Sequence, residues 1–165
     1  MINVVAVAKL EQKGDAESDY NFNSILSELL NVDYRIKHDG TVSQIGQIFR
    51  KNGFYTTREY PICRIKDKSG RAGRIDLVAR KGRFRVAIEY DHHGLIKWKS
   101  FQKIVQIRPD IAIGITGNGD LSPNLERAGK YLKYLTSDLY VVSLKEKKYH
   151  RFGLLYHYAL YEGQH

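Results

Sequence analysis

Two short runs of alternating apolar and polar residues, joined by a Lys-Gly pair, constrain the fold more than any other part of the chain. They make up residues 73–91, with the sequence GRIDLVARKGRFRVAIEYD. Alternation with a period of two predicts paired β-strands, and Lys81-Gly82 at the centre predicts a tight hairpin turn. With these two residues as the loop, Arg80 lies opposite Arg83. The segment therefore predicts an antiparallel pair of strands whose two faces differ in character.

One face of this predicted hairpin is apolar and the other is acidic. The apolar face pairs Ile75 with Ile88, Leu77 with Val86 and Ala79 with Phe84. The other face carries Asp76, with Glu89 and Asp91 close by on the partner strand. Asp76 pairs with Ala87, which makes Glu89 its diagonal neighbour at roughly 7–8 Å between backbones. Carboxylates at that separation can converge on one divalent cation, and their mutual repulsion calls for a metal or for basic partners.

The charge of the chain indicates a polyanionic partner. Lys and Arg total 27 against 18 Asp and Glu, a formal net charge of +9. Nine basic residues lie between Arg64 and Arg85. A basic stretch beside a carboxylate cluster suits a nucleic acid whose phosphates approach a bound metal, although a solubilising surface is the alternative. The candidate nucleic-acid contacts in this stretch are Arg64, Lys66, Lys68, Arg71 and Arg74.

Length and composition predict a single globular domain, residues 1–165. Hydrophobic residues make up 42% of the chain and aromatic residues 12%, which is ordinary for a folded protein. No run approaches the roughly 20 apolar residues that a membrane span needs. The start of the chain lacks the pattern of a secretory signal, and Cys63 is the single cysteine. We therefore expect a cytoplasmic protein without a membrane partner.

Periodicity and boundary signals predict the remaining elements. A Thr41-x-x-Gln44 capping box opens one of the helices, and Ser122-Pro123 opens another. The predicted elements are a strand or anchored tail at 2–8, a loop at 11–19, helices at 23–32, 41–53, 95–108 and 122–135, and strands at 54–63, 111–115, 139–144 and 152–161.

The hairpin resembles the signature of the PD-(D/E)xK nuclease superfamily, a carboxylate at the end of one strand followed by Glu-x-Lys on the next. The matching segments are Gly73-Arg74-Ile75-Asp76-Leu77-Val78 and Val86-Ala87-Ile88-Glu89-Tyr90-Asp91, and the resemblance covers about residues 41–117. It implies an α/β (α+β) fold with a restriction-endonuclease-like mixed central sheet flanked by helices and the core order α-β-β-β-α-β. Asp91 stands where the family usually has lysine.

The resemblance implies a metal-dependent nuclease, with DNA as substrate and endonucleolytic cleavage as the reaction. Asp76 and Glu89 would be the metal ligands, and the Tyr90 carbonyl a third. Oxygen ligands of this kind suit Mg²⁺ or Mn²⁺, which activates a water for in-line attack on phosphorus. Several families of this kind add an acid from the first helix, and Glu28 is the best position here, with Glu17 and Glu59 as alternatives.

The lysine of the family stabilises the hydroxide or the developing phosphate charge, which Asp91 cannot do. A unit charge at 4 Å is worth about 4 kcal/mol at an effective dielectric of 20, so a change of sign matters. Asp91 could instead recruit a second cation. Alternatively the lysine has moved to the next helix, where Lys99 and Lys103 share one stripe. That stripe could also be a solvated helix face.

His92 and His93 follow the second strand and are expected in a polar loop near the scissile bond, among the nucleic-acid contacts. Asp-His after a strand also opens the HNH nuclease motif, but no histidine follows Asn118 until His150. Cys63 and the two histidines lack the ligand spacing of a zinc site.

Two other interpretations fit the same residues. The first is a catalytically inactive nucleic-acid-binding module of nuclease fold, or a subunit of a larger nuclease or transposition assembly. The second is an acidic face that is only a salt-bridged surface, with Glu89 opposite Arg74 and Asp76 leaning on Arg85 or Arg74. A homodimer, in which two sites cut two strands, is a further possibility implied by the resemblance.

Overall fold

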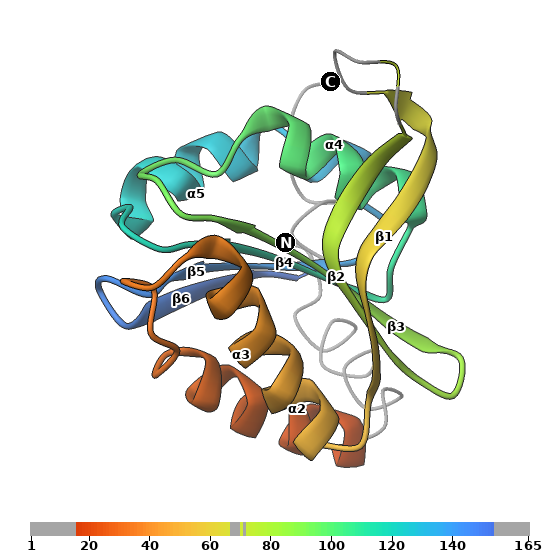
Figure 1. Ribbon diagram of the computed structural model, residues 1–165, viewed down its shortest axis with the longest axis vertical. Helices are drawn as coiled ribbons and strands as arrows, with labels where there is room; N and C mark the ends of the chain where they lie inside the picture. The colour runs from red at the N-terminus through yellow and green to blue at the C-terminus, as the bar shows by residue number, and fades with distance from the viewer. Residues whose placement is uncertain (1–15, 67–69, 71, 154–165) are drawn as a thin grey trace, which may run out of the picture.

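One mixed sheet with helices on both faces forms the part of the chain that the computed structural model describes, residues 16–66, 70 and 72–153 (Figure 1). The helices are α2 (Ala16–Leu29), α3 (His38–Lys51), α4 (Trp98–Ile107), α5 (Leu121–Gly129) and the short 3₁₀ helix η2 (Leu132–Tyr134). The strands are β1 (Tyr55–Lys66), β2 (Ala72–Lys81), β3 (Phe84–Asp91), β4 (Ile111–Thr116), β5 (Asp138–Ser143) and β6 (Lys148–Phe152). This architecture confirms the predicted mixed α/β class.

The six strands are arranged in the order β1-β2-β3-β4-β5-β6. Strands β1 to β3 form an antiparallel meander, β3, β4 and β5 run parallel, and β6 returns antiparallel to β5. Parallel neighbours need a crossover, and α4 and α5 supply it. The carboxyl ends of β3, β4 and β5 therefore meet at one edge of the sheet, where open α/β sheets commonly place their binding sites.

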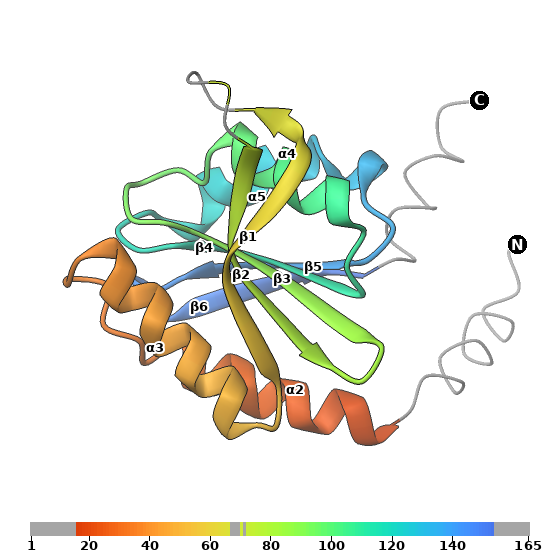
Figure 2. The same cartoon turned by 45° about the vertical axis from the view of Figure 1, so that its right-hand side comes forward.

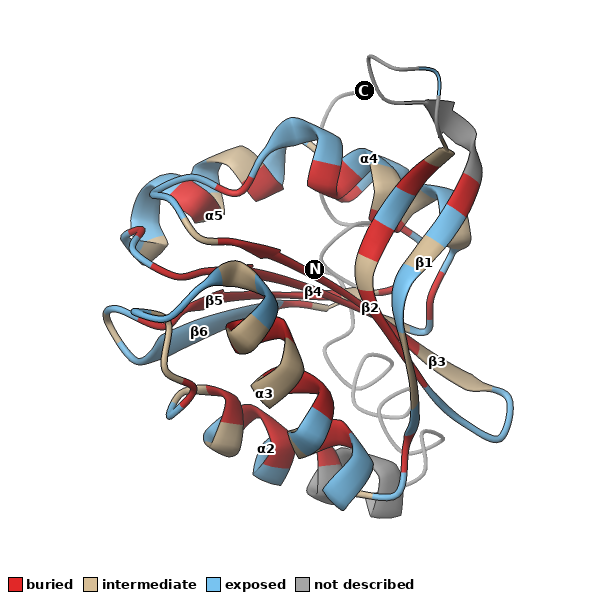
Figure 3. Ribbon diagram, in the orientation of Figure 1, coloured by how far each residue is buried: buried red, intermediate tan, exposed pale blue. Residues whose placement is uncertain are grey.

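Helices α2 and α3 cover one face of the sheet, and α4 and α5 cover the other (Figures 1 and 2). The first layer packs around Leu77, Val86 and Ile88, and the second around Val78 and Ala87. Strand β3 is buried on both faces along most of its length, as Figure 3 shows. A strand in this position brings polar side chains into a dry environment, which is where Glu89 and Asp91 lie.

The hairpin register differs from the predicted one by two residues. Lys81 pairs with Phe84, and Ala79 therefore pairs with Val86. The loop consists of Gly82 and Arg83, and Gly82 has a φ of +59°. A two-residue turn with glycine first takes a positive φ at that position, whereas the predicted loop had glycine second. Because the shift is by two, Leu77, Ala79, Val86 and Ile88 keep the face that alternation predicted. Ile75 does not, because it packs in the opposite layer with Val78 and Ala87.

Some element boundaries also differ from prediction. Helix α2 begins at Ala16, inside the predicted loop. Helix α3 begins at His38 rather than at Thr41, so the capping-box interpretation is wrong. Thr41 Oγ1 instead donates to the Asp33 carbonyl at 3.2 Å, and Gln44 Oε1 accepts from Asp33 N at 3.0 Å. Both side chains hold the loop that precedes the helix.

Three further predictions have simpler outcomes. The helix predicted from 122 divides into α5 and η2, and the last described strand is β6. The predicted strand at 2–8, and most of the one at 152–161, lie outside the described residues. Among the described helices, none is both long enough and apolar enough to cross a membrane.

Candidate active site

Strands β2 and β3 part at Asp76, and side chains there replace the missing backbone ladder. The last recorded pair of the ladder is Leu77 with Ile88. Beyond it, Tyr90 N donates to Asp76 Oδ2 at 2.8 Å, and Asp76 N donates to Glu89 Oε1 at 3.2 Å. Each acid thus accepts a hydrogen bond from the backbone of the opposite strand across the gap.

The neighbouring strand is distorted at the same level. Glu59 has a φ of +52°, and it is skipped in the ladder that pairs its own neighbours with β2. An L-residue in this left-handed region costs roughly 1–2 kcal/mol. The Glu59 carboxylate accepts from Arg74 Nη1 at 3.2 Å, which corrects the expected pairing of Arg74 with Glu89. Irregular backbone therefore surrounds Asp76, as is common at functional sites.

Lys103 of α4 contacts the buried carboxylate of the site. Its Nζ lies 2.6 Å from Glu89 Oε2 and donates to the Arg74 carbonyl at 2.7 Å. The side chains of Glu89 and Lys103 are only 2% and 14% exposed. Burial, together with the nearby Asp76, raises the pKa of Glu89 to about 8, while Lys103 acts in the opposite direction. Lys99, one turn earlier, is exposed instead.

Asp91 has a structural partner, the N-terminus of α4. Its Oδ2 accepts from Lys97 N at 3.0 Å and from Ser100 Oγ at 2.8 Å, and its Oδ1 lies 3.2 Å from Lys97 Nζ. Lys97 is the N-cap residue and has no side-chain acceptor, so a carboxylate from β3 performs the capping. Both oxygens of Asp91 are paired in this way, and its recruitment of a second cation stays a prediction.

His38, the first residue of α3, completes the site and was not predicted from the sequence. Its Nε2 lies 3.2 Å from the Tyr90 carbonyl and 3.6 Å from Asp76 Oδ2. Asp76 raises the pKa of His38 to about 9, so the ring is cationic at neutral pH. No spacing rule links positions 38 and 76, and only the packing of α3 against the sheet brings them together.

The oxygen atoms at this point fit a hard divalent cation. Asp76 and the Tyr90 carbonyl already converge on one cationic group, the His38 imidazolium, and Glu89 adds a second carboxylate beside them. Magnesium is typically held by one or two carboxylates while it keeps several waters. Within the described part of the chain, no group of three or more His, Cys, Asp and Glu side chains is arranged to hold an ion. The oxygen atoms that could hold an ion are those of Asp76 and Glu89 and the Tyr90 carbonyl.

A cavity of about 350 Å³ opens beside these residues. It is lined by Lys37, His38, Tyr90, Asp91, His92, His93 and Lys97. The predicted loop histidines thus line the same cavity as His38 and Asp91, and His92 Nδ1 is 3.0 Å from the Tyr90 hydroxyl. Cationic and imidazole groups around an opening of this kind suit a phosphate that approaches the site.

The loop that carries the histidines is held by buried polar contacts. Asn124 Oδ1 accepts from Ile96 N at 2.7 Å, and its Nδ2 donates to the Gly94 carbonyl at 2.9 Å. A Cβ atom at Gly119 would lie 1.7 Å from the Gly94 carbonyl oxygen, so only glycine fits there. Gly119 therefore marks a close packing contact just after the end of β4.

Glu28 lies far from this site, and its predicted role as a ligand is wrong. Its Oε2 is 3.2 Å from Nζ of Lys51, the last residue of α3, whereas His38 is the first. A helix of 14 residues is about 20 Å long, which separates the two ends. The side chains of Glu17, Cys63, Arg64 and Lys66, together with all of Lys68 and Arg71, lie outside the described residues.

From α3 to β4 the chain runs helix, three strands, helix and strand. Comparisons of the chain with protein-family models, with curated proteins and with solved structures found no match. The chemistry of the side chains around Asp76 is therefore what indicates a function.

Proposed function

We propose that this chain is a metal-dependent nuclease that hydrolyses phosphodiester bonds of DNA, built on a restriction-endonuclease-like core. The observation that carries the proposal is the contact of Lys103 Nζ with Glu89 Oε2, beside Asp76, at the point where β2 and β3 part. Two acids and a lysine in this arrangement resemble the catalytic set of PD-(D/E)xK nucleases. Here the lysine comes from α4 instead of from the strand, where Asp91 caps the helix.

The roles of the residues follow from their positions. Asp76, Glu89 and the Tyr90 carbonyl would hold Mg²⁺ or Mn²⁺, which lowers the pKa of a bound water and neutralises phosphate charge when present. In such a hydrolysis a water oxygen would bond to phosphorus as the bond to the leaving sugar oxygen breaks, and the proton that the water loses would balance the one that the leaving oxygen takes up. Lys103 is placed to stabilise negative charge on the attacking oxygen or the phosphoryl group.

His38 has a role before the metal arrives. The imidazolium contacts Asp76 and the Tyr90 carbonyl, and it offsets the repulsion between two neighbouring carboxylates. Its side chain is 41% exposed, so the ring has room to turn away when a cation takes its place.

The nature of the surroundings supports a nucleic acid as the substrate. Lys37, Lys97 and the two loop histidines line the cavity beside the carboxylates, and the whole chain carries a net charge of +9. Lys and Arg that neutralise phosphates supply most of the affinity for DNA in a manner independent of sequence.

A second candidate is a nucleic-acid-binding module of the same fold without catalysis, acting alone or as a subunit of a larger assembly. The observation in its favour is that each acid already has a basic partner, His38 for Asp76 and Lys103 for Glu89. Acids that are neutralised within the chain need no ion. This candidate binds DNA and leaves it intact.

Cleavage of plasmid, single-stranded and branched DNA in Mg²⁺ or Mn²⁺ distinguishes the two. We expect the wild-type protein to cut, and Asp76→Asn and Lys103→Met to lose at least about a hundredfold in rate while they still bind DNA. Lys99→Met is the matched control, since it removes an exposed lysine one turn away. Binding without cleavage by the wild type in both metals would support the binding module. Cleavage that survives in Asp76→Asn would overturn the proposed site.

A further inference from the structure

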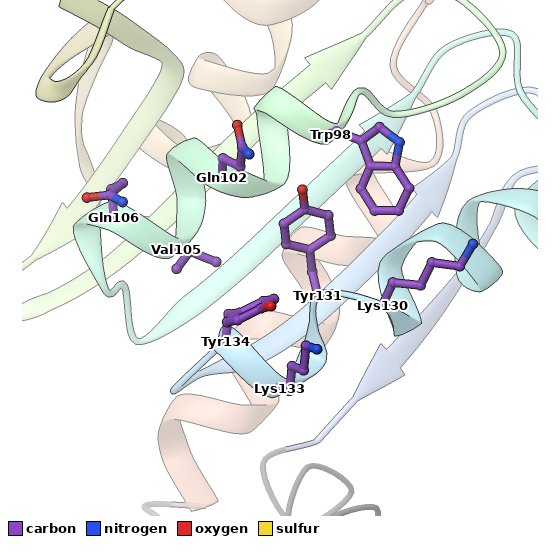
Figure 4. Close-up of a pocket in the computed structure, with 8 residues that line it drawn as sticks. All are labelled: Trp98, Gln102, Val105, Gln106, Lys130, Tyr131, Lys133 and Tyr134. Atoms are coloured by element: carbon purple, nitrogen blue, oxygen red, sulfur yellow. The ribbon is translucent and has the colours of Figure 1, made fainter.

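A groove with exposed aromatic rings lies between α4 and the segment that follows α5. Its volume is about 450 Å³. Trp98, Gln102 and Gln106 line it from α4, and Tyr131 and Tyr134 line it from the other side. Figure 4 shows the Trp98 and Tyr131 side chains entering the space between these two elements. Lysines complete the lining, and none of the described residues that line the groove is acidic.

The rings form a continuous surface, with Arg127 over the Trp98 ring and Lys133 over the Tyr134 ring. The ring centroids of Trp98 and Tyr131 are 4.9 Å apart, and those of Tyr131 and Tyr134 are 6.0 Å apart. Tyr131 stacks on the buried ring of Phe101, with centroids 5.4 Å apart and planes at 20°. Trp98 and Tyr134 are 38% and 56% exposed. The core thus fixes the middle ring, and water meets the two outer rings.

Cations surround the aromatic surface. The guanidinium of Arg127 lies 5.0 Å from the Trp98 ring centre, and the Lys130 ammonium lies 5.8 Å from it. Lys133 Nζ is 5.0 Å from the centre of the Tyr134 ring. Rings that accept a stacked base, bordered by groups that bind phosphate, are the combination found in proteins that hold single strands. Charge complementarity therefore favours a nucleic acid over an apolar protein segment as the occupant.

The groove also lies on the helix that supplies the site lysine. Gln102 and Gln106 flank Lys103 in α4, and Lys103 contacts Glu89 on the adjoining side of the helix. A strand held in the groove would therefore contact the same helix that carries Lys103. The glutamine amides offer both donors and acceptors to base edges.

We propose that this groove binds unpaired bases of single-stranded DNA, stacked on Trp98 and Tyr134, with the phosphates near Lys130 and Lys133. The inference rests on the proposed function, since it assigns to the nuclease a substrate with a single-stranded segment beside the scissile bond. A branched or tailed duplex provides such a segment, and a blunt duplex does not.

Trp98 is the single tryptophan of the chain, so its emission reports on the groove directly. The full-length protein is titrated, without metal, with an oligothymidine and with a blunt duplex of equal length. We expect quenching of the tryptophan emission by the single strand and little change with the duplex. Stacking of a base on an aromatic ring quenches in this way, and its loss weakens binding by about tenfold or more per base.

Variants that keep Trp98 test the same groove by fluorescence anisotropy of a labelled oligothymidine. Tyr134→Ala and Lys133→Ser should each weaken binding, Tyr134→Ala by about tenfold. Tyr55→Ala is the matched control, since Tyr55 is 75% exposed on β1 and should leave the affinity unchanged. Equal losses in Tyr55→Ala and Tyr134→Ala would overturn the proposal.

The remaining outcomes separate this inference from the nuclease proposal. Asp76→Asn should show unchanged quenching by the single strand whether or not the wild type cuts DNA, because Asp76 does not line the groove. Trp98 emission that stays constant at saturating oligothymidine would overturn the groove and leave the carboxylate site untouched. Emission that changes with protein concentration alone would overturn it in favour of a second copy of the chain.

Discussion

Two Glu–Lys ion pairs connect elements within the described part of the chain, and they lie in very different surroundings. Lys103 Nζ and Glu89 Oε2 are 2.6 Å apart, with both side chains largely buried. Lys51 Nζ and Glu28 Oε2 are 3.2 Å apart, and most of the Lys51 side chain is exposed. The first pair joins α4 to the middle of the sheet, and the second joins α2 to the far end of α3.

The difference shows how burial changes the consequences of one and the same pairing. Water screens the exposed pair, and such pairs contribute about 0–1 kcal/mol to the free energy of unfolding. Removing one partner of a buried pair leaves a charge without water and is strongly destabilising. Burial is also what raises the pKa of Glu89. Only the buried pair therefore has the properties of a functional site, and the four experiments below test that distinction.

Replacing each of the two glutamates with glutamine should give the largest contrast, which is in the rate of DNA cleavage. We expect Glu89→Gln to lower the rate of DNA cleavage by at least about a hundredfold, because it removes a ligand charge from the site. Glu28→Gln should leave the rate within about twofold, as for most surface substitutions. The measurement is cleavage of plasmid DNA in Mg²⁺ or Mn²⁺. Equal cleavage rates for the two variants would show that Glu89 has no role in the reaction.

Replacing each of the two lysines with methionine should lower the free energy of unfolding by different amounts. At high pH, Lys103→Met leaves an ionised Glu89 without its cation and should cost about 2 kcal/mol. At low pH the carboxyl takes a proton and the cost should shrink. Lys51→Met should cost less than about 1 kcal/mol at either pH. Urea unfolding at pH 6 and pH 9 measures the loss of stability in both variants. A loss for Lys103→Met that is larger at pH 6 than at pH 9 would contradict an ion pair between Lys103 and Glu89.

The metal-free wild type should lose stability as the pH rises. The pKa of Glu89 rises from 4.5 to about 8 on folding, and that of His38 from 6.5 to about 9. Between the unfolded and the folded pKa of each group, the folded state holds more protons than the unfolded state. The free energy of unfolding therefore falls as the pH rises through each range. The fall should be steepest between pH 6.5 and about 8, where the two ranges overlap. Thermal unfolding measures it, and Glu89→Gln should flatten the curve.

Removal of His38 should have the smallest effect, and in the opposite direction. The imidazolium competes with a cation for Asp76 and the Tyr90 carbonyl, so we expect His38→Ala to bind Mn²⁺ more tightly, by up to about tenfold. Calorimetric titration measures this, with His92→Ala as a control that leaves Asp76 alone. Weaker binding in His38→Ala would make His38 a ligand instead of a competitor.

Alternation predicted the faces of the hairpin but not its register. A shift of two residues preserves the side on which each side chain lies, which holds for Leu77 and Val78. It fails for Ile75, because the ladders of β2 are interrupted at Asp76. The register depended on whether Gly82 was the first or the second residue of the turn. Helical periodicity predicted Lys99 and Lys103 as candidates on one stripe, and of these two Lys103 contacts Glu89 while Lys99 is exposed.

The roles of Asp91 and His38 could not be predicted in the same way. The position of Asp91 in the sequence suggests a catalytic group, yet its carboxylate caps α4 because the chain turns back within six residues. His38 meets Asp76 only through the packing of α3 across the sheet. Both contacts join elements whose relative placement cannot be predicted from a local sequence pattern.

The sequence by itself determined which side chains face the same way, since the periods of strands and helices follow from backbone geometry alone. It thereby determined that Asp76, Glu89 and a lysine of α4 were available to one site. Only the tertiary structure decided which of the available charges meet and which are buried. The physical reason is that burial and long-range contacts depend on how whole layers pack, and it is burial that turns a common ion pair into the centre of a site.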